Sequence, residues 1–397
     1  MRRFLLGRLL LGAAALAAGL LAATVADAQD TIKIGVILSY SGQFADPTAQ
    51  IDSGIKLYLK QHGDKLGGKS VELIRKDVGG INPPVAKRLA QELVTRDGVD
   101  ILTGFSLTPN ALAGADVSVE AKKFMVVLNA ATAIVTTKSP YMVRVSFTVP
   151  QLNQTLGTWA RQQGLKNVYT MVTDYGPGID AEAAFQKGFK EAGGDVVGSV
   201  RMAVQNPDFS AYVQRAKDLD PRGIFIMIPG GAQSPAFGKA LAERGIDPQR
   251  TRVMGQLEIT DEHALASMGD VAVGIITAGH YDYNHHSKLN EEFVKAYNAE
   301  FGRNPDFFSV GGYDGMHLID LALQKSGGKT DADTLVAAAK GASWESPRGP
   351  ISIDPETRDI VQNVYIRRVE KVDGRLVNVE IAEIPNVKDP FKAAMKP

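Results

Sequence analysis

Short apolar segments with strand character alternate with amphipathic helical segments along most of this chain. Residues 32–38 form a nearly continuous apolar run, which is typical of a strand covered on both faces. Asp46 and Pro47 then mark the start of a helix, and the same succession of strand and helix recurs over residues 71–128. Alternation of this kind predicts a mainly parallel sheet with helices on both faces.

A second series of the same type begins after Pro150. It predicts strands at 168–172, 196–200, 224–228 and 252–254, with helices between them. Helices at 289–301 and 310–326 and strand-like segments at 351–353 and 361–369 complete the chain. A chain of 397 residues is too long for one compact core. Because no Gly/Ser-rich tether separates the two series, we expect two doubly wound α/β lobes joined by short crossovers.

Residues 1–28 have the features of a secretory signal peptide. Arg2 and Arg3 give a basic start, residues 9–21 are apolar, and Ala26 and Ala28 place small side chains before a cleavage site. A membrane anchor is the alternative, but a spanning helix needs about 20 apolar residues. We expect export to the periplasm with cleavage near Ala28, and the choice between the general and twin-arginine routes stays open.

Composition limits the classes of partner. The sequence has no cysteine, so disulfides, thiolate metal sites and a lipid-modified cysteine are excluded. Its formal net charge is zero and its basic residues are scattered, which is not the electrostatic footprint of a nucleic-acid-binding protein. No segment after the leader is long and apolar enough to span a bilayer. We therefore expect a monomer that is not inserted in a membrane and that binds a small molecule.

Several short motifs occur in the order found in a known family. They are IKIGV at 32–36, SG at 41–42, GFSLTP at 104–109, NAAT at 129–132, DYGPG at 174–178, PGGA at 229–232, YD at 281–282 and RGPISID at 348–354. Together they resemble the leucine/isoleucine/valine-binding family of ABC-transporter solute receptors, which have the type I periplasmic binding fold. The resemblance implies three crossovers, near 147–149, 277–281 and 349–351. It also implies lobe one from 29–148 plus 281–349, lobe two from 149–280 plus 350–397, and a membrane permease that senses lobe closure.

Two loops of lobe one predict a carboxylate site. Each loop follows a strand, and ligands of open α/β sheets bind at the carboxyl ends of strands, where helix N-termini offer free N–H groups. Backbone amides and hydroxyls there would hold a carboxylate without an arginine, and the family grips the ligand at matching positions. The alternative is that the two threonines only cap a helix or line a turn. The residues concerned are Ser106, Leu107, Thr108, Ala130, Ala131 and Thr132.

The resemblance also predicts contacts from lobe two. Tyr175 matches a family tyrosine that packs over the ligand, the alternative being an aromatic residue of the core. Glu258 is similar in position to the acid that pairs with an amino acid's ammonium group, the alternative being an exposed loop residue.

This chain departs from the family pattern around the expected pocket. Ala232 stands where amino-acid receptors carry tyrosine, and Asn129 stands where proline is common. The enlarged pocket would accept a ring, with Phe44 and Tyr40 as a stacking surface. We therefore favour an aromatic or other non-amino-acid carboxylate, with a branched-chain amino acid as the alternative.

An enzyme is not expected. The sequence contains no G-x-S-x-G elbow, no H-E-x-x-H helix and no G-x-G-x-x-G fingerprint. His285 and His286 are adjacent and have no third ligand nearby in sequence, so we expect no metal site. We expect no catalytic residue and no cofactor, with ATP hydrolysed by a partner. A sensor that signals through a separate membrane protein is the alternative of another class.

Overall fold

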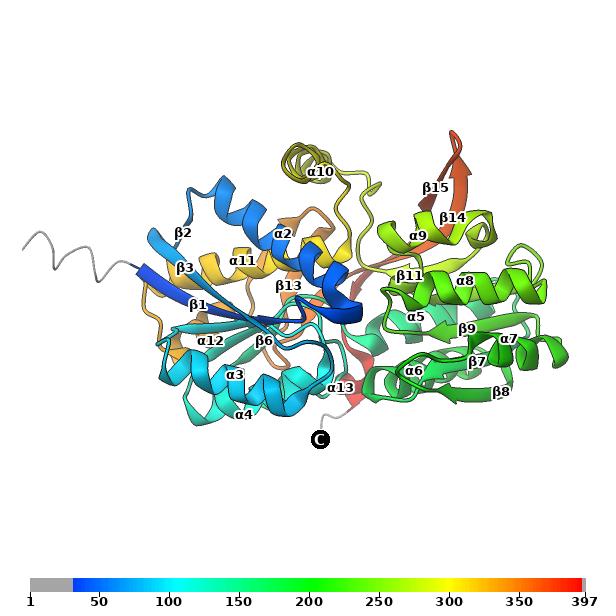
Figure 1. The fold of residues 1–397 in the computed structure, drawn as a ribbon, viewed down its shortest axis with the longest axis horizontal. Helices are drawn as coiled ribbons and strands as arrows, with labels where there is room; N and C mark the ends of the chain where they lie inside the picture. Colours follow the sequence, from blue (N-terminus) through cyan, green and yellow to red (C-terminus); the bar gives the residue numbers. More distant parts are fainter. Residues whose placement is uncertain (1–30, 395–397) are drawn as a thin grey trace, which may run out of the picture.

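The computed structural model of the protein describes residues 31–394. The predicted signal peptide, residues 1–28, lies outside the described residues. The chain forms two lobes side by side, each built on its own sheet, and each lobe combines segments that are distant in sequence (Figure 1). The prediction of two doubly wound α/β lobes is confirmed.

The first sheet has the strand order β2-β3-β1-β4-β5-β6. All its pairings are parallel except β2 with β3. In β1, Ile34 and Val36 pack into the core on one face and Ile37 into the core on the other, as expected for a strand covered on both sides. The strands are β1 (Thr31–Leu38), β2 (Lys65–Leu66), β3 (Lys69–Asp77), β4 (Ile101–Gly104), β5 (Phe124–Val127) and β6 (Met142–Arg144).

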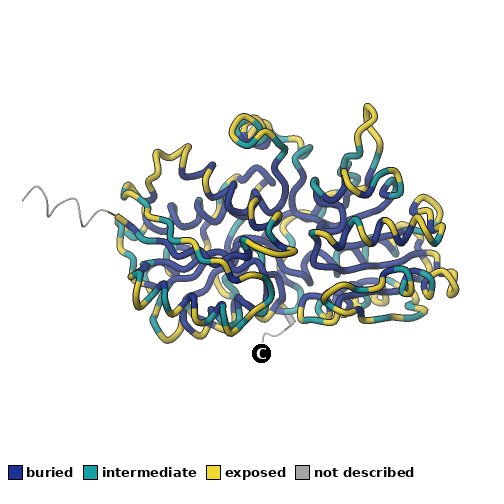
Figure 2. The backbone as a smooth tube through the Cα atoms, viewed as in Figure 1, coloured by how far each residue is buried: buried dark blue, intermediate teal, exposed yellow. Residues whose placement is uncertain are grey.

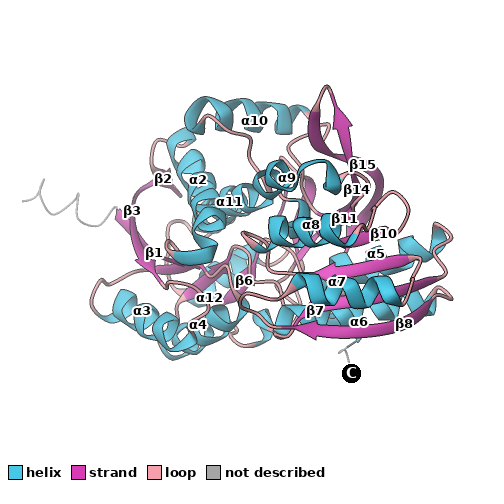
Figure 3. Cartoon of the chain, turned by 45° about the vertical axis from the view of Figure 1, so that its right-hand side comes forward, coloured by secondary structure: helices cyan, strands magenta, loops and turns pink. Residues whose placement is uncertain are grey.

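Helices cover both faces of this sheet. Helix α2 (Ala45–Gln61) packs along α11 (Phe307–Lys325), a segment some 250 residues later in the sequence (Figure 3). On the opposite face α3 (Pro83–Thr95) packs on α4 (Thr108–Glu120). Helix α12 (Ala332–Ala339) lies against β5 and β6, and α10 (Lys288–Phe301) contacts α2.

The second sheet has the order β12-β13-β14-β11-β10-β9-β7-β8, and β15 pairs with β14. Strands β7 to β11 are parallel, whereas β12 to β15 form antiparallel pairs. Its strands are β7 (Asn167–Thr173), β8 (Asp195–Met202), β9 (Gly223–Met227), β10 (Arg252–Gln256), β11 (Ile276–Gly279), β12 (Ser343–Ser346), β13 (Gly349–Ile353), β14 (Ile360–Val372) and β15 (Arg375–Val387).

Helices α5 (Val149–Gln162) and α6 (Gly176–Glu191) pack together against the second sheet. Helix α7 (Phe209–Asp218) packs on α8 (Gln233–Arg244), which contacts α9 (Glu262–Met268). The core residues of α7 and α8 belong to a separate cluster from those of α5 and α6, which places the two helix pairs on opposite faces. The central strands of both lobes are buried, whereas β8 and β15 are largely intermediate or exposed (Figure 2). The short helix α13 (Pro390–Ala394) ends the described chain and contacts α5.

The chain passes between the two sheets three times. Strand β6 leads into α5, the segment after β11 leads to α10, and the segment after α12 leads to β12, which pairs within the second sheet. Three buried arginine–aspartate ion pairs connect the two lobes near these passages. The pairs are Arg144–Asp359 at 2.7 Å, Arg367–Asp282 at 3.3 Å and Arg348–Asp314 at 2.9 Å, with side chains at most 4% exposed. The residue boundaries of the lobes stay a prediction.

One sequence pattern needs the structure to interpret it. Residues 63–70, GDKLGGKS, match the nucleotide-binding pattern G-x-x-x-x-G-K-[ST]. The expectation that a partner hydrolyses ATP overlooked this match. A phosphate-binding loop must connect a strand to a helix N-terminus. Here Lys69 and Ser70 instead begin β3 in an antiparallel hairpin with β2. The segment therefore lacks the geometry of a phosphate-binding loop.

Among residues 31–394, no helix is long and apolar enough to cross a membrane.

Candidate functional site

A cavity lies between the lobes, at the carboxyl ends of strands from both sheets. Its volume is about 30 Å³, roughly the space that one water molecule needs. Of its lining residues, only one carries a formal charge, and that charge is negative. The lining consists of Ser106, Leu107, Thr108, Asn129, Ala131, Phe147, Val149, Tyr175, Pro177, Met227, Pro229, Gln256 and Glu258.

The first lobe-one loop exposes backbone donors to this cavity. Gly104 has a φ of +101°, and a Cβ atom there would lie 2.4 Å from the Ile37 carbonyl oxygen, so the loop can turn here only with glycine. The N-cap of α4 is Leu107, which makes no side-chain cap. Within the described chain, the N–H groups of residues 106–108 have no hydrogen-bond partner. They lie at the positive end of the α4 dipole, where an anion is stabilised.

The second loop, residues 129–132, is held by Arg144 through its backbone carbonyl groups. Its guanidinium donates to the carbonyls of Ala130 (3.1 Å) and Thr132 (2.8 Å). Asp359 neutralises the buried cation. Because the arginine binds the carbonyl side of the loop, the Ala131 N–H stays available beside the cavity. Arg144 therefore organises this loop without lining the cavity.

Thr108 and Thr132 join the two loops. Their hydroxyl groups are 2.9 Å apart, and both side chains are buried. Thr108 is the first residue of α4 rather than its N-cap, so the alternative that Thr108 caps its own helix is wrong. A hydroxyl has one proton and two lone pairs, so one of the two threonines keeps a free donor when the other donates within the pair.

Lobe two contributes Tyr175 and Glu258 from the opposite side. Tyr175 is the N-cap of α6, and Glu258 lies in a 3-10 helix (Leu257–Thr260) directly after β10. Burial raises the pKa of Glu258 to about 7, although hydrogen bonds from Gln256 oppose the shift. Glu258 is only 5% exposed, so the alternative of an exposed loop residue is wrong. Burial, followed by the charge of Glu258, raises the pKa of Tyr175, which keeps its hydroxyl protonated.

The structure brings together part of the predicted site. The predicted residues that line the cavity are Ser106, Leu107, Thr108, Ala131, Tyr175 and Glu258. Ala130, Thr132, Ala232 and Phe44 do not line it. Phe44 is buried at the start of α2, and the Tyr40 hydroxyl donates to Asp52. The aromatic walls of this cavity are instead Phe147 and Tyr175.

The other lining residues were not predicted as ligand contacts, although the position of each in the sequence gave an indication. Phe147 and Val149 lie in the segment predicted as the first crossover. Met227 and Gln256 end buried strands, as Asn129 follows one. Pro177 and Pro229 belong to the family motifs themselves. The position at the carboxyl end of a strand would have indicated most of them.

Polar contacts link the lobes around the cavity. The Ala133 N–H of lobe one donates to Asp180 of α6 at 2.9 Å. On the other side, His263 of α9 pairs with Asp46 of α2 at 3.1 Å, and Asn304 donates to Glu262 at 3.1 Å. The contacts between the two lobes therefore involve charged side chains.

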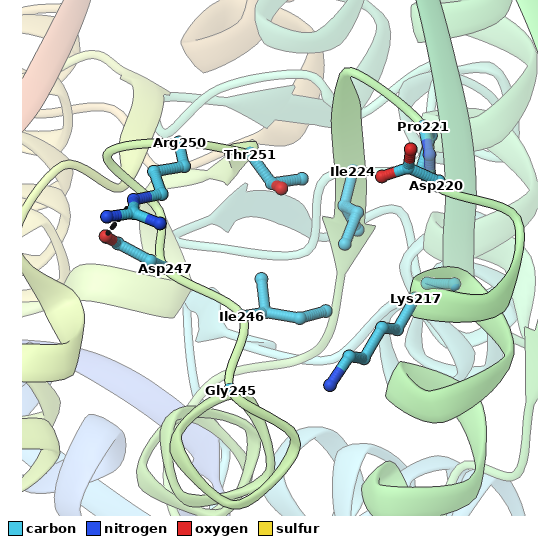
Figure 4. A pocket seen from close by; sticks show the side chains of 10 residues that line it. Lys217, Asp220, Pro221, Ile224, Gly245, Ile246, Asp247, Arg250 and Thr251 are labelled. Carbon is cyan, nitrogen blue, oxygen red and sulfur yellow. Dashed lines mark ion pairs between the residues drawn. The ribbon is translucent and has the colours of Figure 1, made fainter.

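A second cavity of about 280 Å³ lies at the far end of lobe two (Figure 4). Its two cations are engaged locally: Lys217 donates to the Arg244 carbonyl at 2.7 Å, and Arg250 pairs with Asp247 at 3.6 Å. The lining comes from lobe two alone, at the ends of strands away from the cleft. It offers no convergent set of free donors.

Two α/β lobes joined by three passages of the chain, with a cavity between them, have the architecture of a solute-binding receptor. The chain belongs to the periplasmic binding protein family, whose model matches residues 31–375. A curated relative from Brucella melitensis biotype 1, Leu/Ile/Val-binding protein homolog 6, is 43% identical over 374 residues, which is 93% of this chain and 95% of the relative. The family is not enzymatic, and the protein is a solute-binding protein of an ABC transporter.

Two solved structures are similar along nearly their whole length. An ABC-transporter solute-binding protein from Rhodopseudomonas palustris BisB5, in complex with 3,4-dihydroxybenzoic acid, is 50% identical with a TM-score of 0.88, covering 91% of this chain and 99% of that one. Its counterpart from strain HaA2, in complex with p-hydroxybenzoic acid, is 41% identical with a TM-score of 0.89, covering 92% and 100%.

Proposed function

We propose that this protein captures an aromatic carboxylate of the benzoate class for uptake by an ABC transporter. The observation that carries the proposal is the division of the cavity. One end offers free amides and the Thr108 hydroxyl, with no cation among the lining residues, and the middle is walled by Phe147, Tyr175, Val149 and Met227. A planar ring bearing a carboxylate fits this division. The two similar structures, solved with hydroxybenzoic acids, support the same ligand class.

Binding proceeds by closure of the lobes. The cavity of about 30 Å³ is much smaller than a benzoate, so the walls must separate before a ring can enter. The carboxylate docks on the α4 N-terminus and the Ala131 loop of lobe one. Lobe two then closes and adds Tyr175 and Glu258. The ligand shifts the open–closed equilibrium because it contacts the closed form more extensively.

The closed form is the state that the membrane permease recognises. The protein acts in the periplasm as a monomer, after removal of the leader near Ala28, and ATP hydrolysis belongs to its partner. Size-exclusion chromatography with light scattering tests the monomer, and a dimer at micromolar concentration would refute it.

A branched-chain amino acid is the second candidate. The name of the curated relative favours it, and Glu258 is placed to pair with an ammonium group.

A thermal-shift panel separates the two candidates. The ligand-stripped protein is tested against benzoate, 4-hydroxybenzoate, leucine, isoleucine and valine. A ligand at about 100 times its Kd stabilises the native state by roughly 2.7 kcal/mol. We expect the melting temperature to rise with the aromatic acids alone. A rise with the amino acids alone would refute the proposal and assign Glu258 to the ammonium group.

A further inference from the structure

Three buried polar side chains form a hydrogen-bonded chain that ends in the cavity. Asn153 of α5 donates to the Gln256 side-chain oxygen at 2.6 Å. Gln256 in turn donates to both carboxylate oxygens of Glu258, at 2.7 and 2.8 Å. Their exposed fractions are 0%, 1% and 5%. Gln256 and Glu258 line the cavity, so the chain links the helix interior of lobe two to the ligand space.

The direction of this chain is fixed by chemistry. Asn153 also donates to the Val149 carbonyl at 2.9 Å, so its amide nitrogen is the donor on both bonds. The Gln256 oxygen then accepts, which leaves its amide nitrogen as the donor to Glu258. One N–H group, shared between the two oxygens of the carboxylate, accounts for both contacts. These hydrogen bonds therefore orient the Glu258 carboxylate, which is an acceptor group, at the cavity wall.

The hydrogen bonds from Gln256 orient the carboxylate. Gly230, with a φ of +78°, lies against the same side chain, and a Cβ atom there would lie 3.1 Å from the Glu258 Cβ. The Ser234 hydroxyl holds the Glu258 backbone carbonyl at 2.9 Å. Among the residues that the structure describes, no lysine, arginine or histidine forms an ion pair with Glu258. A carboxylate oxygen accepts more than one hydrogen bond, so capacity remains for a donor from the ligand.

An aromatic acid can supply that donor only through a ring substituent. Its own carboxylate belongs at the lobe-one end, because the reverse orientation would bring two carboxylates together at Glu258. The group that faces Glu258 is then the substituent opposite the carboxylate. Both similar structures were solved with acids that carry a hydroxyl group at this position.

We propose that Asn153, Gln256 and Glu258 form a specificity device that recognises a hydrogen-bond donor at the 4-position of the ring, so that the receptor selects 4-hydroxybenzoates over benzoates without the hydroxyl. This inference rests on the proposed function. Glu258 makes the contact, and Asn153 and Gln256 are positioning residues. A ligand without the donor leaves a buried acceptor unpaired, which lowers its affinity.

Titration calorimetry on the full mature protein tests the device with a ligand series. The series contains 4-hydroxybenzoate and 4-aminobenzoate, which have a donor, and benzoate and 4-fluorobenzoate, which do not. We expect the donors to bind at least about tenfold more tightly, because a hydrogen bond to a charged group is worth that or more. Equal affinities across the series in the native protein would overturn the inference but leave the proposed function standing. Absence of binding by all four acids would overturn both.

The variant Glu258→Gln supplies the second arm. We expect the ratio of the benzoate Kd to the 4-hydroxybenzoate Kd to fall at least about fivefold, whatever happens to the absolute affinities. The matched control is Glu182→Gln, a buried glutamate of α6 that pairs with Arg201 and does not line the cavity. A ratio that stays at the native value in Glu258→Gln would overturn the inference. The native ligand series decides the matter if the variant does not fold.

Discussion

Thr108 and Thr132 show how a single residue type can serve an anion site without a cation. Their paired hydroxyls connect the α4 N-terminus to the next loop, and Arg144 holds that loop from its carbonyl side. An arginine in the cavity would hold a carboxylate as a buried ion pair, and forming that pair would require desolvation of both charges each time a ligand binds. The arrangement suits a receptor that must release its ligand.

The substitution Thr108→Val removes the hydroxyl that both lines the cavity and pairs with Thr132. We expect the affinity for benzoate and for 4-hydroxybenzoate to fall together by about tenfold, because a hydrogen bond to a charged group is lost. Thr132→Val acts only through Thr108 and should cost less. Titration calorimetry of both variants measures this order, and unchanged affinity in Thr108→Val would remove the threonine pair from the site.

At the level of elements, helix α9 of lobe two and helix α2 of lobe one form a latch through His263 and Asp46. The hydrogen bond that the His263 ring donates to Asp46 raises the pKa of His263, with a further contribution from the charge of Asp306, while burial and the charge of Arg303 oppose it. A raised histidine pKa means that the pair contributes below the ordinary value of about 6.5 and is lost as pH rises through the raised value.

The latch predicts a pH dependence of binding. The affinity of the native protein for benzoate should fall as pH rises from about 6 to 8.5. In His263→Gln this loss of affinity should be about two- to fivefold smaller, because a partly exposed ion pair contributes up to about 1 kcal/mol. Comparison of the native protein with the variant cancels the contribution of Glu258. Identical pH profiles for the two proteins would mean that the latch does not act in the bound state.

The crossovers are stabilised by buried ion pairs, of which Arg348–Asp314 has both side chains at most 1% exposed. Arg348→Met removes one charge and leaves Asp314 buried without it. We expect the free energy of unfolding to fall by about 3–5 kcal/mol, measured by urea denaturation. Lys187→Met breaks an exposed pair with Glu191 and should change it by less than about 1 kcal/mol. Similar losses in both variants would contradict this role.

The sequence predicted the elements whose signals are local. The strand at 32–38 and the helix start near Asp46 depend on neighbouring residues, and both are present, although the helix begins at Ala45 and Asp46 does not cap it. Phe44 was placed wrongly relative to the present cavity because its position depends on how α2 packs on α11. The Asn153–Gln256–Glu258 chain was missed for the same reason, since it joins residues 103 positions apart.

Considered as a whole, the protein concentrates buried acids where the lobes meet. Burial raises the pKa values of Glu258, Glu262 and Asp306 to about 7 and that of Asp261 to about 6. A carboxyl group with a raised pKa binds more protons in the native state than in the unfolded state. Its contribution to stability therefore falls as pH rises from its ordinary value to the raised one. Buried His280, whose pKa burial lowers well below its ordinary value, opposes this trend at acid pH.

The variant Glu262→Gln isolates one of these acids while keeping an acceptor for Asn304. Relative to the native protein, its stability should increase by about 1 kcal/mol between pH 5.5 and pH 7.5, because the native protein loses stability over that range and the variant lacks the titrating group. Denaturant titrations at the two pH values measure the difference. A constant difference would show that Glu262 is not perturbed.

We propose that the lobe-one end of the cavity, whose lining has no cation, holds the ligand's carboxylate, and that lobe two binds the substituent at the other end of the ring. A crystal structure with bound 4-hydroxybenzoate would show both contacts. We expect carboxylate oxygens within hydrogen-bond distance of the Thr108 hydroxyl and the free amides of residues 106–108 and Ala131, and the ring hydroxyl within that distance of Glu258. A carboxylate at the Glu258 end, or a ligand outside this cavity, would contradict it.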